Sequence, residues 1–596
     1  MPTFFTLHPL DIAAIVAYFA AVMAIGFWAS RRVKDEKDFF MGGRRFGKGL
    51  LVMHWLCTGT HSEMAVQVAG ATARVGLGGI WYQWMYLFST PFYWMIAPVT
   101  RRLRVLTTGD FFRIRYGRAL EMLYSVVALF YFAQSIATLL RGAGEAISGA
   151  TGGQIPTQTS VIVLSLLFST YIMAGGLVAA AYTDFLQGVM IMALSVMLVP
   201  AGLARIGGLA GLHASLPAEM FAITAPAGSK EGDPWAVVAL SVLGLVGIVA
   251  QPHVMSATGS GKTETEARVG MCYGNFIKRL LTIAWAFSGL IALVHFRGAA
   301  GMASAGLEVS GSEKLFGQSV REFLPVGWRG LMIACLIAGV TGAETFMVVA
   351  SAIFTRNFYV HIVRGRSDAH YLWFGRCASA GMLALSIVLA FHAESVNQLF
   401  VNSIKIIGLL GASFWLGVTW RRANAAGVWA SVLGGALVWG LLSWAAAPMG
   451  GRPPENLATS WPASWAAHFA DWSEPVRVLA MLAAQFGALI AVSLLTRRPT
   501  DERLDPFFAR LLTPVGRENE VLLAANAAEL PESATLGMEG VLLDYQKAAR
   551  FGYAGLRRLG IELPRLTRFD GLGFLAAWGL VGILIMLLYW LAGLGA

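Results

Sequence analysis

The hydrophobic positions of this chain fall in long blocks that polar residues do not interrupt. Residues 12–30 and 572–596 contain no charged side chain. Both blocks exceed the roughly 18 apolar residues that mark a membrane-spanning helix. The pattern therefore predicts an all-α integral membrane protein with about 14 transmembrane helices. The predicted spans cover 10–30, 49–71, 77–100, 119–140, 159–174, 182–204, 235–255, 280–296, 330–355, 377–393, 397–419, 425–446, 478–496 and 571–594.

The composition agrees with that pattern. Of the 596 residues, 56% are hydrophobic and 13% are charged, whereas soluble domains carry about 25% charged residues. A soluble enzyme and a disordered chain are therefore excluded. The 4 cysteines provide neither a disulfide framework nor a CxxC pair for zinc.

The net charge of +11 suggests nucleic-acid binding until the basic residues are placed on the predicted spans. Most Lys and Arg residues then lie in the loops after odd-numbered spans. The positive-inside rule places these loops in the cytoplasm and both termini outside. The excess charge thus faces anionic lipid of an inner or plasma membrane, and no nucleic-acid partner is expected.

Three regions follow along the chain. Residues 1–496 form the membrane core, residues 497–570 a cytoplasmic amphipathic segment, and residues 571–596 an additional C-terminal transmembrane helix. The middle segment could rest on the bundle surface or act as a regulatory module with a protein partner.

Two predicted spans contain interruptions. Span 2 holds the small, polar run 57–63, and span 7 holds Gln251-Pro252-His253 after several glycines. Broken helices at membrane depth are tolerated where they line a cavity. Spans 2–6 and 7–11 each contain five helices, so the second set enters the membrane inverted, as in transporters with inverted repeats. The alternative is that glycine and proline only kink ordinary helices.

Several motifs resemble those of the sodium/solute symporter family, which includes proline permease and the sodium/glucose cotransporters. They are residues 37–44, 108–117 and 175–187, together with Gln251-Pro252-His253. The resemblance covers roughly residues 8–500. It implies a LeuT-type fold and cation-coupled uptake, most simply with sodium, of a small polar or anionic solute by alternating access. No cofactor and no enzymatic activity are expected.

The resemblance also implies a sodium site between the break in span 2 and the middle of span 9. Matched by motif, Thr60, Glu63 and Ala338 would offer backbone carbonyls and Thr341 a hydroxyl. The family places a second hydroxyl directly after the first, but this chain has Gly342 there. Proton-coupled or ion-independent transport is therefore kept as an alternative. The resemblance further suggests that Asp184 helps the ion leave, whereas its alternative role, shared with Thr183, is to cap span 6.

Four ionisable residues lie inside predicted spans: His61, Glu63, Glu344 and Lys405. Charges at membrane depth are costly and mark ion pathways or paired groups. We expect Lys405 or His61 to pair with Glu63 or Glu344. The alternatives are a purely structural ion pair and a Lys405 side chain that extends to the surface.

The solute cavity of this fold is lined by spans 2, 3, 7, 9 and 11. The candidate solute-binding residues are Gln67, Gln83, Trp84, Gln398 and Asn402. An unpaired Lys405 in the cavity would favour an anionic solute. Residues 257–263 resemble a phosphate-binding loop but follow a membrane span rather than a strand, so nucleotide binding is not favoured. A transporter-like sensor acting through residues 497–570 remains the competing class.

Overall fold

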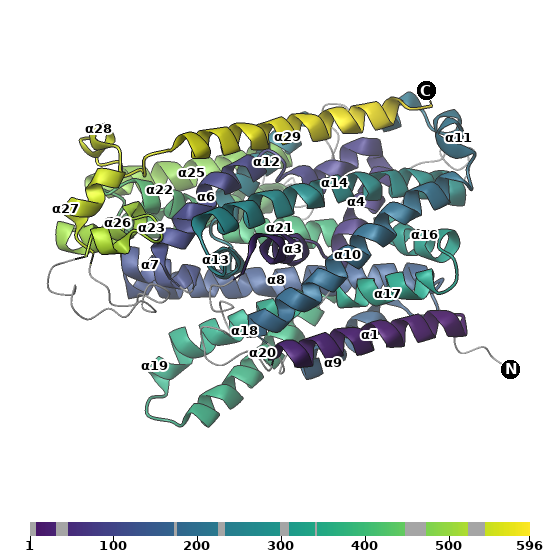
Figure 1. The fold of residues 1–596 in the computed structure, drawn as a ribbon, viewed down its shortest axis with the longest axis horizontal. Helices are drawn as coiled ribbons and strands as arrows, with labels where there is room; N and C mark the ends of the chain where they lie inside the picture. Colours follow the sequence, from purple (N-terminus) through teal and green to yellow (C-terminus); the bar gives the residue numbers. More distant parts are fainter. Residues whose placement is uncertain are drawn as a thin grey trace, which may run out of the picture.

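The structure is a computed structural model that describes residues 7–30, 46–105, 107–171, 176–224, 233–297, 309–339, 342–446, 472–522 and 543–595. These residues form an elongated helical bundle with both ends of the chain near one end of the long axis (Figure 1). Among them, 8 helices are long and apolar enough to cross a membrane, or 9 if one bent pair counts as a span. The multi-pass helical class is thus confirmed, while the predicted number of 14 spans is not.

The predicted break in span 2 is present. Helix α3 (Lys48–Thr58) ends before Gly59, and α4 (Ser62–Val75) begins after His61, whose extended backbone (φ −123°, ψ 169°) forms the N-cap. The small, polar run between the helices lets the backbone leave the helical conformation, since its carbonyl and amide groups can bind other partners.

The predicted break in span 7 is also present. Helices α12 (Pro234–Ile248) and α13 (Pro252–Gly259) meet at an angle of 60°. Pro252 occupies the first turn of α13, where its missing N–H is not needed by the helix. Each interruption therefore lies at a point where the sequence weakens helical hydrogen bonding.

Two long helices hold these broken helices. Helix α14 (Glu264–Arg297) packs on α3, α4 and α6 (Thr90–Leu103), and α8 (Arg118–Ala150) packs on α4 and α21 (Val396–Gly408). The contact between α8 and α4 depends on Gly142, because a Cβ there would lie 2.1 Å from the Cβ of Glu63. Small residues commonly allow such close approach between membrane helices.

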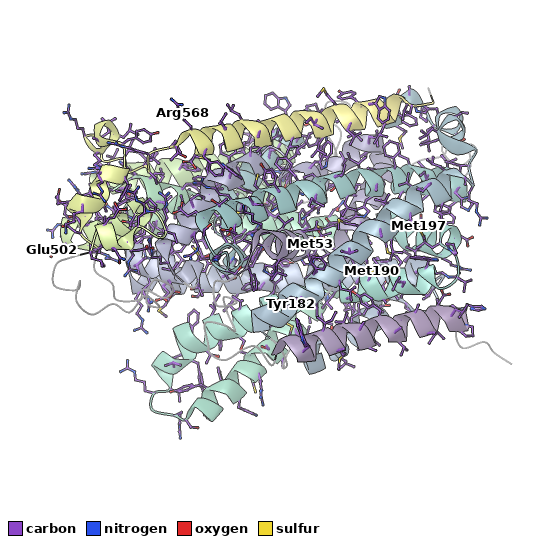
Figure 2. The ribbon with its side chains drawn as sticks, in the orientation of Figure 1. Met53, Tyr182, Met190, Met197, Glu502 and Arg568 are labelled. Atoms are coloured by element: carbon purple, nitrogen blue, oxygen red, sulfur yellow. The ribbon has the colours of Figure 1, made fainter. Side chains whose placement is uncertain are left out.

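Helix α10 (Gly176–Leu203) lies between α3 and α1 (Pro9–Ser30). Figure 2 shows Tyr182 at the crossing with α1 and Met190 and Met197 further along α10. The rings of Tyr182 and Trp28 are 5.2 Å apart. Because α10 begins at Gly176, neither Thr183 nor Asp184 is at its N-terminus, and the predicted capping role is wrong.

The C-terminal residues fold against one end of the bundle. Helices α26 (Asp501–Leu512), α27 (Tyr545–Ala548) and α28 (Ala554–Arg557) gather beside α7 (Thr108–Tyr116), at the left in Figure 1. We call the end of the bundle that α7, α26, α27 and α28 form the basic end. Helix α29 (Arg568–Gly593) then runs back along the bundle against α6, where Phe574 contacts Phe92 at 5.3 Å between ring centroids.

Candidate solute and ion site

The two helix ends implied for ion binding lie next to each other. Helix α17 (Trp328–Ala338) ends beside the start of α4, because a Cβ at Gly339 would lie 3.0 Å from the Ser62 backbone nitrogen. Helix α18 (Gly342–Phe354) continues the chain. Thr341 lies outside the described residues, and so do the side chains of Glu344 and Asp184. The structure thus brings Thr60, Glu63 and Ala338 into one region.

Buried oxygen atoms gather at the start of α4. Thr60 Oγ1, Ser62 Oγ and Glu63 Oε2 have no hydrogen-bond partner within the part of the chain that the structure describes. Their side chains are nearly inaccessible, with 2%, 4% and 3% exposure respectively. An unsatisfied buried polar atom costs about 1–3 kcal/mol. Oxygen donors of this type are the ligands that hard cations prefer.

A cavity of about 90 Å³ opens beside this break. It is enclosed by α3, α4, α6, α8, α12, α13, α14, α18 and α21. Its charged or ionisable side chains, apart from tyrosines, are His61, Glu63, His253, Lys278 and Arg279. The remaining polar lining residues are Tyr86, Tyr93, Tyr131, Ser135, Thr138, Gln251, Asn275 and Ser403.

Lys278 brings a positive charge to the break in span 2. A Cβ at Gly59 would lie 3.5 Å from Lys278 Nζ and 3.8 Å from Asn275 Oδ1. Lys278 is 4% exposed, and its ammonium group forms no ion pair or hydrogen bond with any residue that the structure describes. The ammonium group is therefore available to a ligand in the cavity.

The neighbouring Arg279 is already engaged. Its Nη1 donates to the Gln83 carbonyl over 2.8 Å, and its guanidinium lies 5.5 Å from the centre of the Tyr86 ring. Sequence reasoning missed both residues because span 8 was predicted to start at residue 280, whereas α14 begins at Glu264. The apolar and small residues of 267–277 could have indicated that the helix begins before residue 280.

None of the five candidate solute-binding residues lines this cavity. Gln83 Nε2 donates to Gln67 Oε1 over 2.8 Å, so the two buried amides bind each other. Trp84 Nε1 donates to the Arg279 carbonyl. Gln398 is exposed at the start of α21, where it accepts from the Glu394 backbone, and Asn402 is half-buried outside the cavity lining.

The predicted pairing of Lys405 with Glu63 is wrong, and the side chain of Glu344, the other predicted partner, lies outside the described residues. Lys405 forms its ion pair with Glu474, the first residue of α25 (Glu474–Leu495), and its ammonium lies 6.0 Å from the centre of the Trp439 ring. The long lysine stem lets the charge reach an acid on a neighbouring helix. His61, in contrast, lines the same cavity as Glu63.

The chain is similar to known transporters over most of its length. The family model described as "Sodium:solute symporter family" matches residues 39–435. Sodium/myo-inositol cotransporter 2 of Mus musculus is 25% identical over 469 residues, which cover 73% of this chain and 70% of that protein. Sodium/glucose cotransporter 1 of Oryctolagus cuniculus is 25% identical over 470 residues, which cover 71% and 70% respectively.

A solved structure shares the fold. It is described as the substrate-bound outward-open state of a Na⁺-coupled sialic acid symporter, and it matches with a TM-score of 0.64 at 17% sequence identity. The match covers 83% of this chain and 99% of the other. This similarity supports the LeuT-type fold.

Proposed function

Because the chain belongs to the sodium:solute symporter family, it is a sodium-coupled membrane transporter of a small solute and not an enzyme. We propose that the solute carries an acidic group and that Lys278 binds this group. The cavity beside the break in span 2 is the proposed binding site. The observation that carries the proposal is the buried Lys278 ammonium, which faces the cavity without an ion-pair partner among the described residues.

The charges around the cavity favour an anion. Glu63 is the one carboxylate among its described lining residues, against Lys278 and Arg279. Arg279 is held by the Gln83 carbonyl, which leaves Lys278 as the cation that a solute can reach. A solute carboxylate would compensate the cost of burying this ammonium. The hydroxyl and amide groups of the lining would bind the rest of a polar molecule.

Glutamine in place of Lys278 should weaken binding of carboxylate solutes about 10–100-fold, because a hydrogen bond between charged groups contributes roughly 1.5–3 kcal/mol. Binding is measured in detergent, with sodium, across short carboxylates, amino acids, glucose and myo-inositol. Lys278→Arg keeps the charge and is the matched control.

Two results separate this proposal from its competitor. A wild-type protein that binds the neutral polyols named for its relatives, but no carboxylate, would contradict the anionic solute. Sodium-dependent binding of a carboxylate that Lys278→Gln leaves unchanged would contradict the role of Lys278. A neutral polyol is the second candidate solute because the lining is rich in hydroxyl and amide groups.

For the ion, we propose that Thr60, Glu63 and Ala338 contribute carbonyl oxygens, Thr341 a hydroxyl, and Ser62 the hydroxyl that Gly342 lacks. The support for Ser62 is its position: its backbone faces Gly339 at the end of α17, and its Oγ has no hydrogen-bond partner within the described part of the chain.

Asp184 is proposed to assist ion release. The cytoplasmic position of the basic end belongs to the same proposal and rests on the distribution of Lys and Arg.

Ser62→Ala should raise the sodium concentration needed for half-maximal thermal stabilisation roughly tenfold, since one oxygen ligand is removed. The readout is the melting temperature of the purified protein during a sodium titration in which potassium replaces sodium, so that the ionic strength stays constant. Ser403→Ala is the control, because the Ser403 hydroxyl lines the cavity but already donates to the Phe400 carbonyl. A wild-type sodium response in Ser62→Ala would exclude Ser62 as a ligand.

A further inference from the structure

A second cavity, of about 430 Å³, lies at the basic end of the bundle. It is formed by the turn after α22 (Gly411–Thr419), the start of α26, and the region of α27 and α28. None of its lining residues belongs to the solute cavity. The proposed transport of a solute through the first cavity therefore does not involve this second cavity.

The cavity is lined by more positive than negative side chains. Its arginines are Arg421, Arg422, Arg498, Arg557 and Arg558, and its carboxylates are Asp501, Asp505 and Glu562. Hydrogen bonds from Arg421 hold the pKa of Asp501 below its usual range, so this carboxylate is charged at neutral pH. The lining therefore keeps an excess of positive charge.

Arg421 forms an ion pair with each of the three carboxylates. Arg421 contacts Asp501 at 2.8 Å and Glu562 at 3.1 Å, and it also pairs with Asp505. Arg498 binds Asp501 over 3.0 Å. The tyrosine hydroxyl of Tyr545 adds a hydrogen bond to Glu562. Arg421 and its neighbours thus bind Asp501, Asp505 and Oε1 of Glu562, while Oε2 of Glu562 has only an ion-pair contact with Arg557.

Three other arginines retain unused donors. Arg557 Nε and Nη2 are buried without a hydrogen bond, although Nε lies 3.4 Å from Glu562 Oε2. Arg422 Nη2 donates to the Leu494 carbonyl over 2.8 Å, while its Nε is buried without a partner. Arg558 is exposed at the cavity and forms no ion pair with any described residue.

We propose that this cavity binds a phosphoryl group through Arg422, Arg557 and Arg558. Guanidinium groups match the tetrahedral oxygens of phosphate by paired hydrogen bonds. Such a ligand would bind the accessible parts of these guanidinium groups and balance the excess charge. Exposed apolar side chains flank the site, with Leu495 at 85% and Leu559 at 69% exposure. Basic pockets beside membrane helices bind anionic lipid headgroups, and a soluble phosphate compound offers the same chemistry.

Two arms of one experiment test the site and identify the source of the phosphate. In the first arm, inorganic phosphate or ATP is titrated into the detergent-purified protein and the melting temperature is recorded. In the second arm, the protein is placed in nanodiscs of phosphatidylcholine with or without phosphatidic acid. Either ligand should stabilise the wild type, and Arg557→Gln with Arg558→Gln should weaken that binding at least tenfold.

The controls keep the result interpretable. Arg550→Gln removes an exposed charge of the same region that is paired with Glu520 outside the cavity, and it should bind like the wild type. Arg558→Gln alone changes an exposed side chain and serves if the double variant does not fold. No stabilisation in either arm, or equal weakening by Arg550→Gln, would overturn the proposal. Stabilisation in one arm alone supports it and identifies the source.

Discussion

Replacing Arg104 by methionine should lower the free energy of unfolding by roughly 3–5 kcal/mol, the usual cost of leaving one partner of a buried ion pair uncompensated. The Arg104 and Glu518 side chains are each 3% exposed and lie 2.8 Å apart. Arg104 also donates to the carbonyls of Arg102, Arg510 and Thr513. The measurement is unfolding in a titrated denaturing detergent.

The matched control is the double variant in which both Arg104 and Glu518 become methionine. Neither charge of this pair then remains buried, so the double variant should lose less stability than the two single variants together. Additive losses would contradict a direct coupling between the two side chains. Burial lowers the pKa of Arg104 and the charge of Glu518 opposes this shift, which is consistent with a pair that depends on both members.

Leucine in place of Gly142 should reduce sodium-dependent uptake by about 100-fold, because α4 must move away from α8. The Cβ alone would lie 2.1 Å from Glu63 Cβ and 2.5 Å from Glu63 Cα. Overpacking typically costs about 1–3 kcal/mol, and a displacement of about 1 Å in a binding site can cost about 100-fold in rate. The measurement is uptake by proteoliposomes, together with the melting temperature.

Gly440→Leu is the control for the glycine change. Gly440 lies in α23 (Ala425–Ala446), and apart from its chain neighbours and the backbone of its own helix, no described heavy atom lies within 4 Å of its ideal Cβ position. This variant should transport like the wild type. Undiminished uptake by Gly142→Leu would show that α4 tolerates displacement and that the site does not require this close approach.

The breaks in spans 2 and 7 could be predicted because their signals are local. Gly59 and Pro252 weaken helical hydrogen bonding wherever the chain places them, so no knowledge of neighbours is needed. The number of membrane spans was harder to predict from the sequence, because interrupted helices and short helices break up the long hydrophobic blocks by which a span is recognised. The extended start of α14 was missed for a related reason: Lys278 and Arg279 read as loop residues by polarity.

Partners distant in sequence could not be predicted. The depth of Lys405 along its own helix does not reveal that α25 begins with Glu474 beside it. Gln67 and Gln83 have the chemistry of solute ligands, but in the fold the Gln83 amide nitrogen donates to the Gln67 amide oxygen. The motif resemblance located the region around Thr60 and Glu63. The proposed role of Ser62 as an ion ligand, in contrast, rests on the position of Gly339 beside it, which only the structure reveals.

The contacts of Arg104 have an evolutionary consequence. Its acceptors include Thr513 and Glu518, which lie beyond the predicted membrane core of residues 1–496. A relative without a comparable C-terminal segment would carry a buried guanidinium with too few acceptors if it kept arginine at this position. We therefore expect Arg104 and the acceptor residues to be gained and lost together across lineages. Covariation between these two regions would record when the extension became a structural part of the transporter.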